Sequence, residues 1–471
     1  MNKEDICFMS ASQMLKAIKN QELTSLEITE TIIERIEKIN PIINAYCTLT
    51  FDLAREMAKK ADEAVKKGEK LSPLHGIPTS IKDLNLTRGI RTTFGSKIYE
   101  NFIPDEDGLC VARLKKAGIV ILGKTNTPEF GYAGVTDNKI FGPTKNPWNL
   151  KRTPGGSSGG AAAAVASGIS PLALGGDGGG SIRHPATFCG IYGIKPQYGR
   201  VPDYPKTGVS FYFTQRGPLV RYVEDAALML DILKGPHEQD RNSLPKQDIS
   251  YFEKINEKPD KLKVGYTLNL GYAKIIDSEV EKNVIDSVQK LEKLGWSIEP
   301  MNLKIRSPFL AFTTLYTASY AYNYKSYLKE WRDKMDPDFL KLIDAGMTYS
   351  GLNIMKAMDK RINFYEKISE LFRKYDILIT PTVAIPAFEL GMMFPPEING
   401  ERVGPTSWMP FTFPFNLTGN PAATIPCGWS KDGLPIGMQI VGPKFDELTV
   451  LQVSKAFEEI APWQDKKPPL K

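Results

Sequence analysis

Histidine is scarce in this chain of 471 residues, which has only His75, His184 and His237. The three lie far apart and form no H-x-x-x-H pair or Cys/His cluster, so little is available from which to build a zinc site. The five cysteines are also widely spaced, with no C-x-x-C pair, which favours reduced thiols over a disulfide framework. We therefore expect no metal centre.

Long apolar runs are absent as well. No stretch of about 18 apolar residues could span a membrane, and the N-terminal "MNKEDICFMSASQ" lacks the apolar core of a secretory signal. The net charge is +6, but basic residues alternate with acidic ones instead of forming a basic stripe. These absences argue against membrane insertion and nucleic-acid binding, and they predict a cytoplasmic protein.

The residues that are present predict helices first and a sheet later. Apolar residues three and four apart in "SLEITETIIERIEKIN" predict a helix that is capped by Ser25 and stops before Pro41. Short β-branched runs then alternate with helical runs, which predicts an α/β fold with a mixed sheet covered by helices. Within a single large domain, 1–471, we distinguish four segments: a helical segment (1–70), a core (71–235), an inserted helical lobe (about 307–375) and a C-terminal sheet and helix (376–460).

Two glycine-rich stretches stand out, "TPGGSSGGAAAAVASG" at 153–168 and "GGDGGGSIRHP" at 175–185. Glycine in folded backbone costs roughly 0.5–1 kcal/mol relative to alanine, so such clusters indicate positive φ angles or a close approach to another group. Taken alone, the first stretch also fits an ordinary helix with a serine N-cap. Together they place Ser157 and Ser181 on tight turns, where either could act as a nucleophile.

A serine nucleophile needs a base, and the chain offers two kinds. His184 lies three residues from Ser181, but a base must face the serine hydroxyl, and the adjacent Pro185 stiffens the turn. Lys82 lies in the short strand "IPTSIKDL", where flanking apolar residues favour the burial that would keep a lysine neutral. Spacing alone does not decide between the two.

A nucleotide-binding loop can be excluded. Residues 118–125, "GIVILGKT", match the P-loop pattern letter for letter. However, "IVIL" predicts a buried strand, whereas a phosphate loop needs exposed backbone amides. Pro128 would also fall inside the first turns of the helix that must follow such a loop. The match is therefore a coincidence of letters.

The two glycine-rich stretches and the upstream "GIPTSIKDL" together resemble the amidase signature family. The resemblance is strong over about residues 71–235 and weaker in "DILITPT" and "NLTGNPAATIPCG". It implies a catalytic triad of Lys82, Ser157 and Ser181, with a cis peptide bond between Gly156 and Ser157. It also implies an oxyanion hole formed by the backbone amides of Gly178, Gly179, Gly180 and Ser181.

The resemblance further implies hydrolysis of carboxylic amides through an acyl-serine intermediate, with a small-molecule amide substrate and no cofactor. In this interpretation Asp177 and Arg183 hold the glycine loop by an ion pair, and Asp83 orients the strand that carries Lys82. The A subunit of a glutamine-dependent tRNA amidotransferase is the alternative, since it uses the same triad. Its glutamine-binding arginine and aspartate are not recognisable in 340–375. A homodimer is left open.

An aromatic stripe begins after Ser307-Pro308 and repeats every three or four residues along an expected helix. Core packing is one interpretation of the stripe. The other is that its middle, Tyr316 and Tyr320, lines a cavity for hydrophobic or aryl acyl groups. His184 stands where the family often has glutamine, and we assign it to the same pocket. The members of the stripe are Phe309, Phe312, Tyr316, Tyr320, Tyr324, Tyr327 and Trp331.

Overall fold

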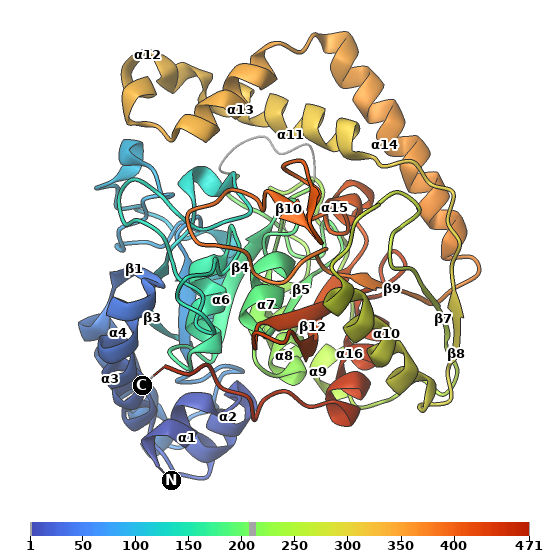
Figure 1. Cartoon of the computed structure of the whole chain (residues 1–471). Helices are drawn as coiled ribbons and strands as arrows, with labels where there is room; N and C mark the ends of the chain where they lie inside the picture. The colour runs from blue at the N-terminus through green and yellow to red at the C-terminus, as the bar shows by residue number, and fades with distance from the viewer. Residues whose placement is uncertain (1, 207–212, 471) are drawn as a thin grey trace.

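An eleven-stranded sheet forms the centre of the protein (Figure 1). The structure is a computed structural model that describes residues 2–206 and 213–470. The strands lie in the order β1-β3-β2-β4-β6-β5-β12-β13-β9-β7-β8. Their bounds are β1 Tyr46–Leu49, β2 Pro78–Lys82, β3 Val120–Thr125, β4 Leu172–Asp177, β5 Tyr192–Lys195, β6 Gln215–Val220, β7 Lys263–Tyr266, β8 Ser297–Pro300, β9 Ile377–Pro381, β12 Ala422–Trp429 and β13 Pro435–Val441, and a separate pair is formed by β10 Glu397–Ile398 and β11 Glu401–Arg402.

The sheet is mixed, as predicted. β2 runs parallel to both β3 and β4, whereas β4 runs antiparallel to β6. Every residue of β2, β3, β4 and β6 is buried, because helices cover both faces of the sheet. The second glycine-rich stretch begins in this buried central part of the sheet, at the end of β4, whereas the first forms a turn and α6 (Gly159–Ala166).

The helices that cover the sheet come from all parts of the chain (Figure 1). α6 is deeply packed, since each of its eight residues is buried. A Cβ at Gly160 in this helix would lie 2.4 Å from the backbone nitrogen of Asn126, so the helix backbone touches its neighbours directly. Their bounds are α1 Lys3–Phe8, α2 Ala11–Lys19, α3 Ser25–Ile43, α4 Phe51–Lys66, α5 Leu109–Lys116, α6 Gly159–Ala166, α7 Arg183–Cys189, α8 Val223–Leu233, α9 Tyr251–Lys254, α10 Ser278–Glu292, α11 Phe309–Tyr324, α12 Leu328–Trp331, α13 Pro337–Met347, α14 Gly351–Leu371, α15 Phe413–Thr418 and α16 Glu447–Ile460.

The first amphipathic helix differs from its prediction at both ends. Thr24, not Ser25, is the N-cap of α3, and it forms a capping box with Glu27. The helix also continues through Pro41 to Ile43. A proline removes one helical hydrogen bond and crowds the preceding turn, but here only two helical residues follow it before Asn44 ends the helix in a left-handed conformation.

The predicted strand at "IVIL" is present as part of β3, and all six residues of β3 are buried. The P-loop interpretation is therefore excluded. Residues 309–371 are mainly helical, and Figure 1 shows α11, α13 and α14 lying together across one end of the sheet. None of the helices in the described part of the chain combines the length and the apolar character that crossing a bilayer requires.

Candidate active site

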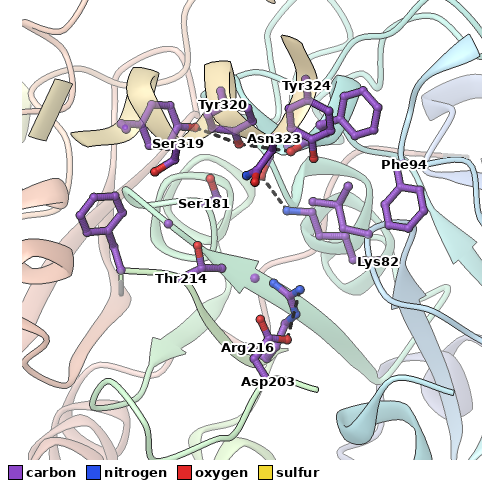
Figure 2. Close-up of a pocket in the computed structure, with 18 residues that line it drawn as sticks. Lys82, Phe94, Ser181, Asp203, Thr214, Arg216, Ser319, Tyr320, Asn323 and Tyr324 are labelled. Carbon is purple, nitrogen blue, oxygen red and sulfur yellow. Dashed lines mark hydrogen bonds and ion pairs between the residues drawn. The ribbon is translucent and has the colours of Figure 1, made fainter. Parts of the chain in front are cut away.

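The end of a strand and two turns meet at one edge of the sheet. Lys82 is the last residue of β2, Ser157 lies in the turn before α6, and Ser181 follows β4 and precedes α7. Because β2 and β4 are parallel neighbours, their carboxyl ends lie at the same edge, which is where α/β folds place their ligands. Lys82, Ser157 and Ser181 all line one cavity (Figure 2).

Lys82 is buried, with 1% of its surface exposed. Its Nζ lies 2.7 Å from Ser157 Oγ and 2.9 Å from Ser158 Oγ. Burial holds the pKa of Lys82 well below its usual value, and the positive charge of Arg216 lowers it further, against a smaller opposing effect of Asp177. A lysine in these surroundings favours the neutral amine, which can accept a proton.

The serines next to Lys82 come from the first glycine-rich stretch. The peptide bond between Gly156 and Ser157 is cis, as the resemblance implies. Ser158 was not singled out from the sequence, yet its hydroxyl contacts Lys82 and also donates to the carbonyl of Gly176 at 3.2 Å. Lys82 therefore donates to two adjacent hydroxyls, and that of Ser158 also ties it to the end of β4. Only the neighbouring "SS" pair in the sequence could have pointed to Ser158.

Asp177 organises the second glycine-rich stretch. Its carboxylate accepts hydrogen bonds from the backbone amides of Gly180, at 2.7 Å, and Ile182, at 3.2 Å. The predicted ion pair with Arg183 is present, with two contacts of 2.9 Å. Burial alone would raise the pKa of Asp177, but the Arg183 guanidinium outweighs it and holds that pKa below its usual range. A charged, fully buried pair thus fixes the turn that carries Ser181.

The contact with Asp177 bears on the predicted oxyanion hole. Since the Gly180 amide already donates to a carboxylate, it is not free to donate into the cavity, in contrast to the prediction. Gly180 is required for a different reason. Its φ is +134°, and a Cβ there would lie 2.1 Å from Nε2 of His184. Gly178, Gly179 and Ser181 are partly exposed, and Gly178 and Ser181 line the cavity.

His184 does not line the cavity, so its assignment to the substrate pocket is wrong. It is buried behind the glycine turn, with its ring centroid 4.9 Å from that of Trp408. Its Nε2 contacts Thr412 Oγ1 at 2.6 Å, and that hydroxyl donates to the carbonyl of Gly179. A hydroxyl has one proton, so His184 Nε2 is the donor in its contact. Burial lowers the pKa of His184 to about 3, which leaves a neutral ring that supports the turn.

The side chain of Asp83 points away from Lys82, towards Thr93 and Lys124. Its carboxylate accepts from the backbone nitrogen and hydroxyl of Thr93, at 2.9 and 2.5 Å, and lies 3.6 Å from Lys124 Nζ. Its backbone amide donates to the carbonyl of Thr125 in β3. These contacts fix the end of β2 from the side opposite the cavity, which agrees with the expected support of the Lys82 strand.

The cavity has an aromatic side and a polar side (Figure 2). Tyr316 and Tyr320 of α11 belong to the aromatic side of this cavity. Arg216 and Asp203 lie on the opposite side and were not singled out from the sequence. The lining residues are Lys82, Leu84, Phe94, Phe130, Gly131, Ser157, Gly176, Gly178, Ser181, Asp203, Phe213, Thr214, Arg216, Tyr316, Ser319, Tyr320, Asn323 and Tyr324.

Comparison with known proteins identifies the family of the chain. A family model described as Amidase matches residues 27–451. The chain belongs to the amidase signature family. It is 36% identical to an acylamidase of Rhodococcus erythropolis over 474 residues, covering 99% of this chain and 98% of that protein. The membership and these relatives confirm the prediction of an amide hydrolase.

Two further family members illustrate the range of relatives. The A subunit of the glutamyl-tRNA(Gln) amidotransferase of Carboxydothermus hydrogenoformans is 37% identical over 494 residues, covering 99% of this chain and all of that protein. The crystal structure of a bacterial aryl acylamidase superposes with a TM-score of 0.91 at 31% identity, covering 97% of each chain. The match to a solved family structure also confirms the predicted α/β architecture.

Proposed function

We propose that the chain hydrolyses its amide substrate through an acyl-enzyme on Ser181, with Ser157 as proton relay and Lys82 as base. The observation that carries the proposal is the 2.7 Å contact between Lys82 Nζ and Ser157 Oγ, in a cavity that Ser181 also lines. Serine needs a base to become nucleophilic. Lys82 is the buried amine in this cavity that faces a hydroxyl and no carboxylate.

The proton path follows from this contact. Neutral Lys82 accepts a proton from Ser157, Ser157 accepts one from Ser181, and the Ser181 oxygen attacks the amide carbon. The relay then returns the proton to the departing nitrogen, so the C–N bond breaks and an ester remains on Ser181. Water that is activated by the same relay cleaves the ester and releases the acid. Lys82 ends each half-reaction neutral.

The oxyanion of the tetrahedral intermediates needs fixed hydrogen-bond donors. With Gly180 engaged by Asp177, we assign this role to the backbone amides of Gly178, Gly179 and Ser181. Glycine at 178 and 179 lets these amides face the cavity without a side chain in the way. A Cβ at Gly179 would lie 2.9 Å from the ring of Phe312, so a larger residue would displace that ring.

The aromatic side of the cavity favours an apolar or aryl group on the substrate. Tyr316 and Tyr320 face it from α11, and their hydroxyls are occupied by the backbone carbonyls of Tyr132 and Phe130. With the hydroxyls tied down, mainly ring surface remains for a ligand. Aromatic rings that are held in this way bind flat apolar groups well. Hydrolysis of aryl amides is therefore our first expectation.

The amidotransferase subunit remains a second candidate, which the 37% identity to such a subunit favours. The pocket also contains an arginine and an aspartate, Arg216 and Asp203, although both lie outside residues 340–375. Activity of the isolated chain on aryl, aliphatic and peptide amides would favour the hydrolase. Co-purification with partner subunits, and activity on glutamine alone, would favour the amidotransferase.

Trapping with a fluorophosphonate tests the assignment of the nucleophile. Mass spectrometry should locate the label on Ser181, and Ser157→Ala should slow labelling by orders of magnitude without moving it. Ser319 lines the same cavity and offers a matched control, since Ser319→Ala should leave the label in place. A label on Ser157, Ser158 or Ser319 would contradict the assignment.

Location and assembly stay predictions. We propose that the protein works in the cytoplasm on a small-molecule amide, which fractionation of its host cells would test. A homodimer remains open, and sedimentation velocity on the purified chain would decide it.

A further inference from the structure

Two arginines near the site differ in how their donors are used. Arg183 is fully buried and makes five hydrogen bonds, two of them to Asp177. Arg216 is also nine-tenths buried, yet in the described structure its guanidinium makes no hydrogen bond at all. Its one ionic contact there is with Asp203, at 3.6 Å. A guanidinium has five N–H donors, and buried donors are normally satisfied.

A glycine on the neighbouring strand leaves room for the side chain of Arg216. Arg216 in β6 lies opposite Gly176 in β4. A Cβ at position 176 would lie 2.9 Å from Nη1 of Arg216, so the glycine leaves the space in which the guanidinium lies. Gly176 is not in the left-handed region, which means that space, not backbone conformation, requires glycine here. Gly176, Arg216 and Lys82 line the same cavity.

Asp203 does not fully occupy Arg216. The contact is longer than a hydrogen bond, and the Asp203 side chain is 32% exposed. One monodentate contact of this length leaves the planar fork of the guanidinium free for a second, bidentate partner. Figure 2 shows Arg216 and Asp203 together on the side of the cavity opposite Tyr320 and Tyr324, with Ser181 and Thr214 between the two sides.

We infer that Arg216 binds a carboxylate of the substrate, so that the preferred substrates are amides that carry both a carboxylate and an apolar or aryl group. A carboxylate matches the fork geometry of a guanidinium and satisfies two of its donors at once. Asp203 then competes with the substrate for Arg216 and keeps the empty cavity close to electrically neutral. The inference rests on the proposed amide hydrolysis at Ser181 and adds the class of substrate.

The test compares matched substrates that differ only in the carboxylate. The acyl pair is the 4-nitroanilide of succinic acid and that of butanoic acid, and the amine pair is 4-(butanoylamino)benzoate and butanoylaniline. Each kcat/KM is measured at the alkaline plateau of the variant concerned, so that protonation of Lys82 does not enter. The wild-type protein should prefer the acid by about 10- to 100-fold in at least one pair, as a charged hydrogen-bonded contact supplies.

The variants should move this preference in opposite directions. Arg216→Met should abolish it, and Arg216→Lys should retain only part of it because an ammonium cannot bind in the bidentate manner. Asp203→Asn removes the competitor and should increase the preference. In the Ser181→Ala protein, calorimetry should detect binding of the acid, and Arg216→Met added to it should weaken that binding about 10-fold or more.

The outcomes separate the inference from the proposed function. The inference is wrong, while amide hydrolysis stands, if the wild-type protein hydrolyses the neutral amide and the acid of both pairs with equal kcat/KM. It is also wrong if Arg216→Met leaves the preference for the acid intact. If no amide of either pair is hydrolysed and Ser181 is not labelled by a fluorophosphonate, the proposed function itself fails. Should Arg216→Met not fold, Arg216→Lys and Asp203→Asn still give opposite signs, and a fall in both would overturn the inference.

Discussion

Lys82 and Lys124 make an instructive pair, because both are buried lysines on neighbouring parallel strands. Lys82 ends β2 and Lys124 is one residue from the end of β3. Neither is more than 1% exposed. Burial lowers the pKa of both. What separates them is the set of groups that each ammonium or amine faces.

Lys124 faces a carboxylate and Lys82 does not. Nζ of Lys124 lies 3.6 Å from Asp83 and donates to the carbonyl of Asn85 and the hydroxyl of Thr92. Asp83 therefore opposes the effect of burial on the pKa of Lys124. Lys82 faces two hydroxyls, and the positive Arg216 adds to the effect of burial. The same residue type is thus a structural cation on one strand and a candidate base on the next.

Replacing each lysine by methionine should reveal the largest difference between the two residues. Lys82→Met removes the base and should lower kcat/KM on any amide by at least about 10³-fold, a typical contribution of general base catalysis. Lys124→Met leaves Asp83 buried without its cation, so the free energy of unfolding should fall by about 3–5 kcal/mol. Urea denaturation and steady-state kinetics on both variants measure the two effects.

A second replacement serves as the control. Asp83→Leu added to Lys124→Met removes both charges, and replacing a buried pair by apolar residues is often close to neutral. The double variant should therefore recover most of the lost stability. If Lys124→Met proved as inactive as Lys82→Met while remaining folded, the distinction between the two lysines would not hold.

The pH dependence of activity sharpens the comparison. Lys82 acts as the neutral amine, so kcat/KM should rise with pH as Lys82 loses its proton, and the rise should be complete well below the ordinary lysine pKa of about 10.4. Arg216→Met removes a repulsive charge, which raises the pKa of Lys82 and moves the rise to higher pH. A pH–rate profile of each protein measures the shift.

His184→Gln is the matched variant for this experiment. Because the pKa of His184 is held at about 3, its ring stays neutral across the working range and cannot produce the rise. The shape of the profile should therefore survive the substitution. A rise near pH 6.5 that disappears in His184→Gln would instead indicate a histidine base.

The smallest expected effect concerns selection by the aromatic side of the cavity. Tyr316→Ala should reduce the preference for aryl over short aliphatic amides by about 10-fold, since one lost packing contact is worth roughly 1–3 kcal/mol. Tyr322 lies on the same helix but is 67% exposed, and Tyr322→Ala should leave the ratio unchanged. Equal rate ratios in all three proteins would show that the stripe serves core packing alone.

Much of the site could be predicted because its motifs are local. Lys82, Ser157 and Ser181 each lie inside a short motif whose letters carry the resemblance. Arg216 could not be found in this way, since its place depends on the register that sets it opposite Gly176. His184 was assigned to the wrong side of its turn, because the direction of a side chain that follows Ser181 by three residues depends on how α7 begins.

The fold shows the same division between local and distant information. Alternating β-branched and helical runs predicted the mixed sheet, but not the order of its eleven strands, which depends on pairing between distant segments. The sequence predicts a helix end at Pro41, because it does not reveal that α3 continues for two residues beyond the proline. The resemblance implies that the Gly180 amide donates into the cavity. Only the folded turn shows that this amide donates to Asp177 instead.

The position of α11 has a consequence for how such an enzyme can diverge. This helix supplies Tyr316, Ser319, Tyr320, Asn323 and Tyr324 to the cavity, whereas Lys82, Ser157 and Ser181 come from the sheet and its turns. Mutations accumulating along one helix can thus alter which amides fit while the proton path stays as it is. Descendants of a common ancestor could acquire new substrates by drift in α11, without passing through an inactive intermediate.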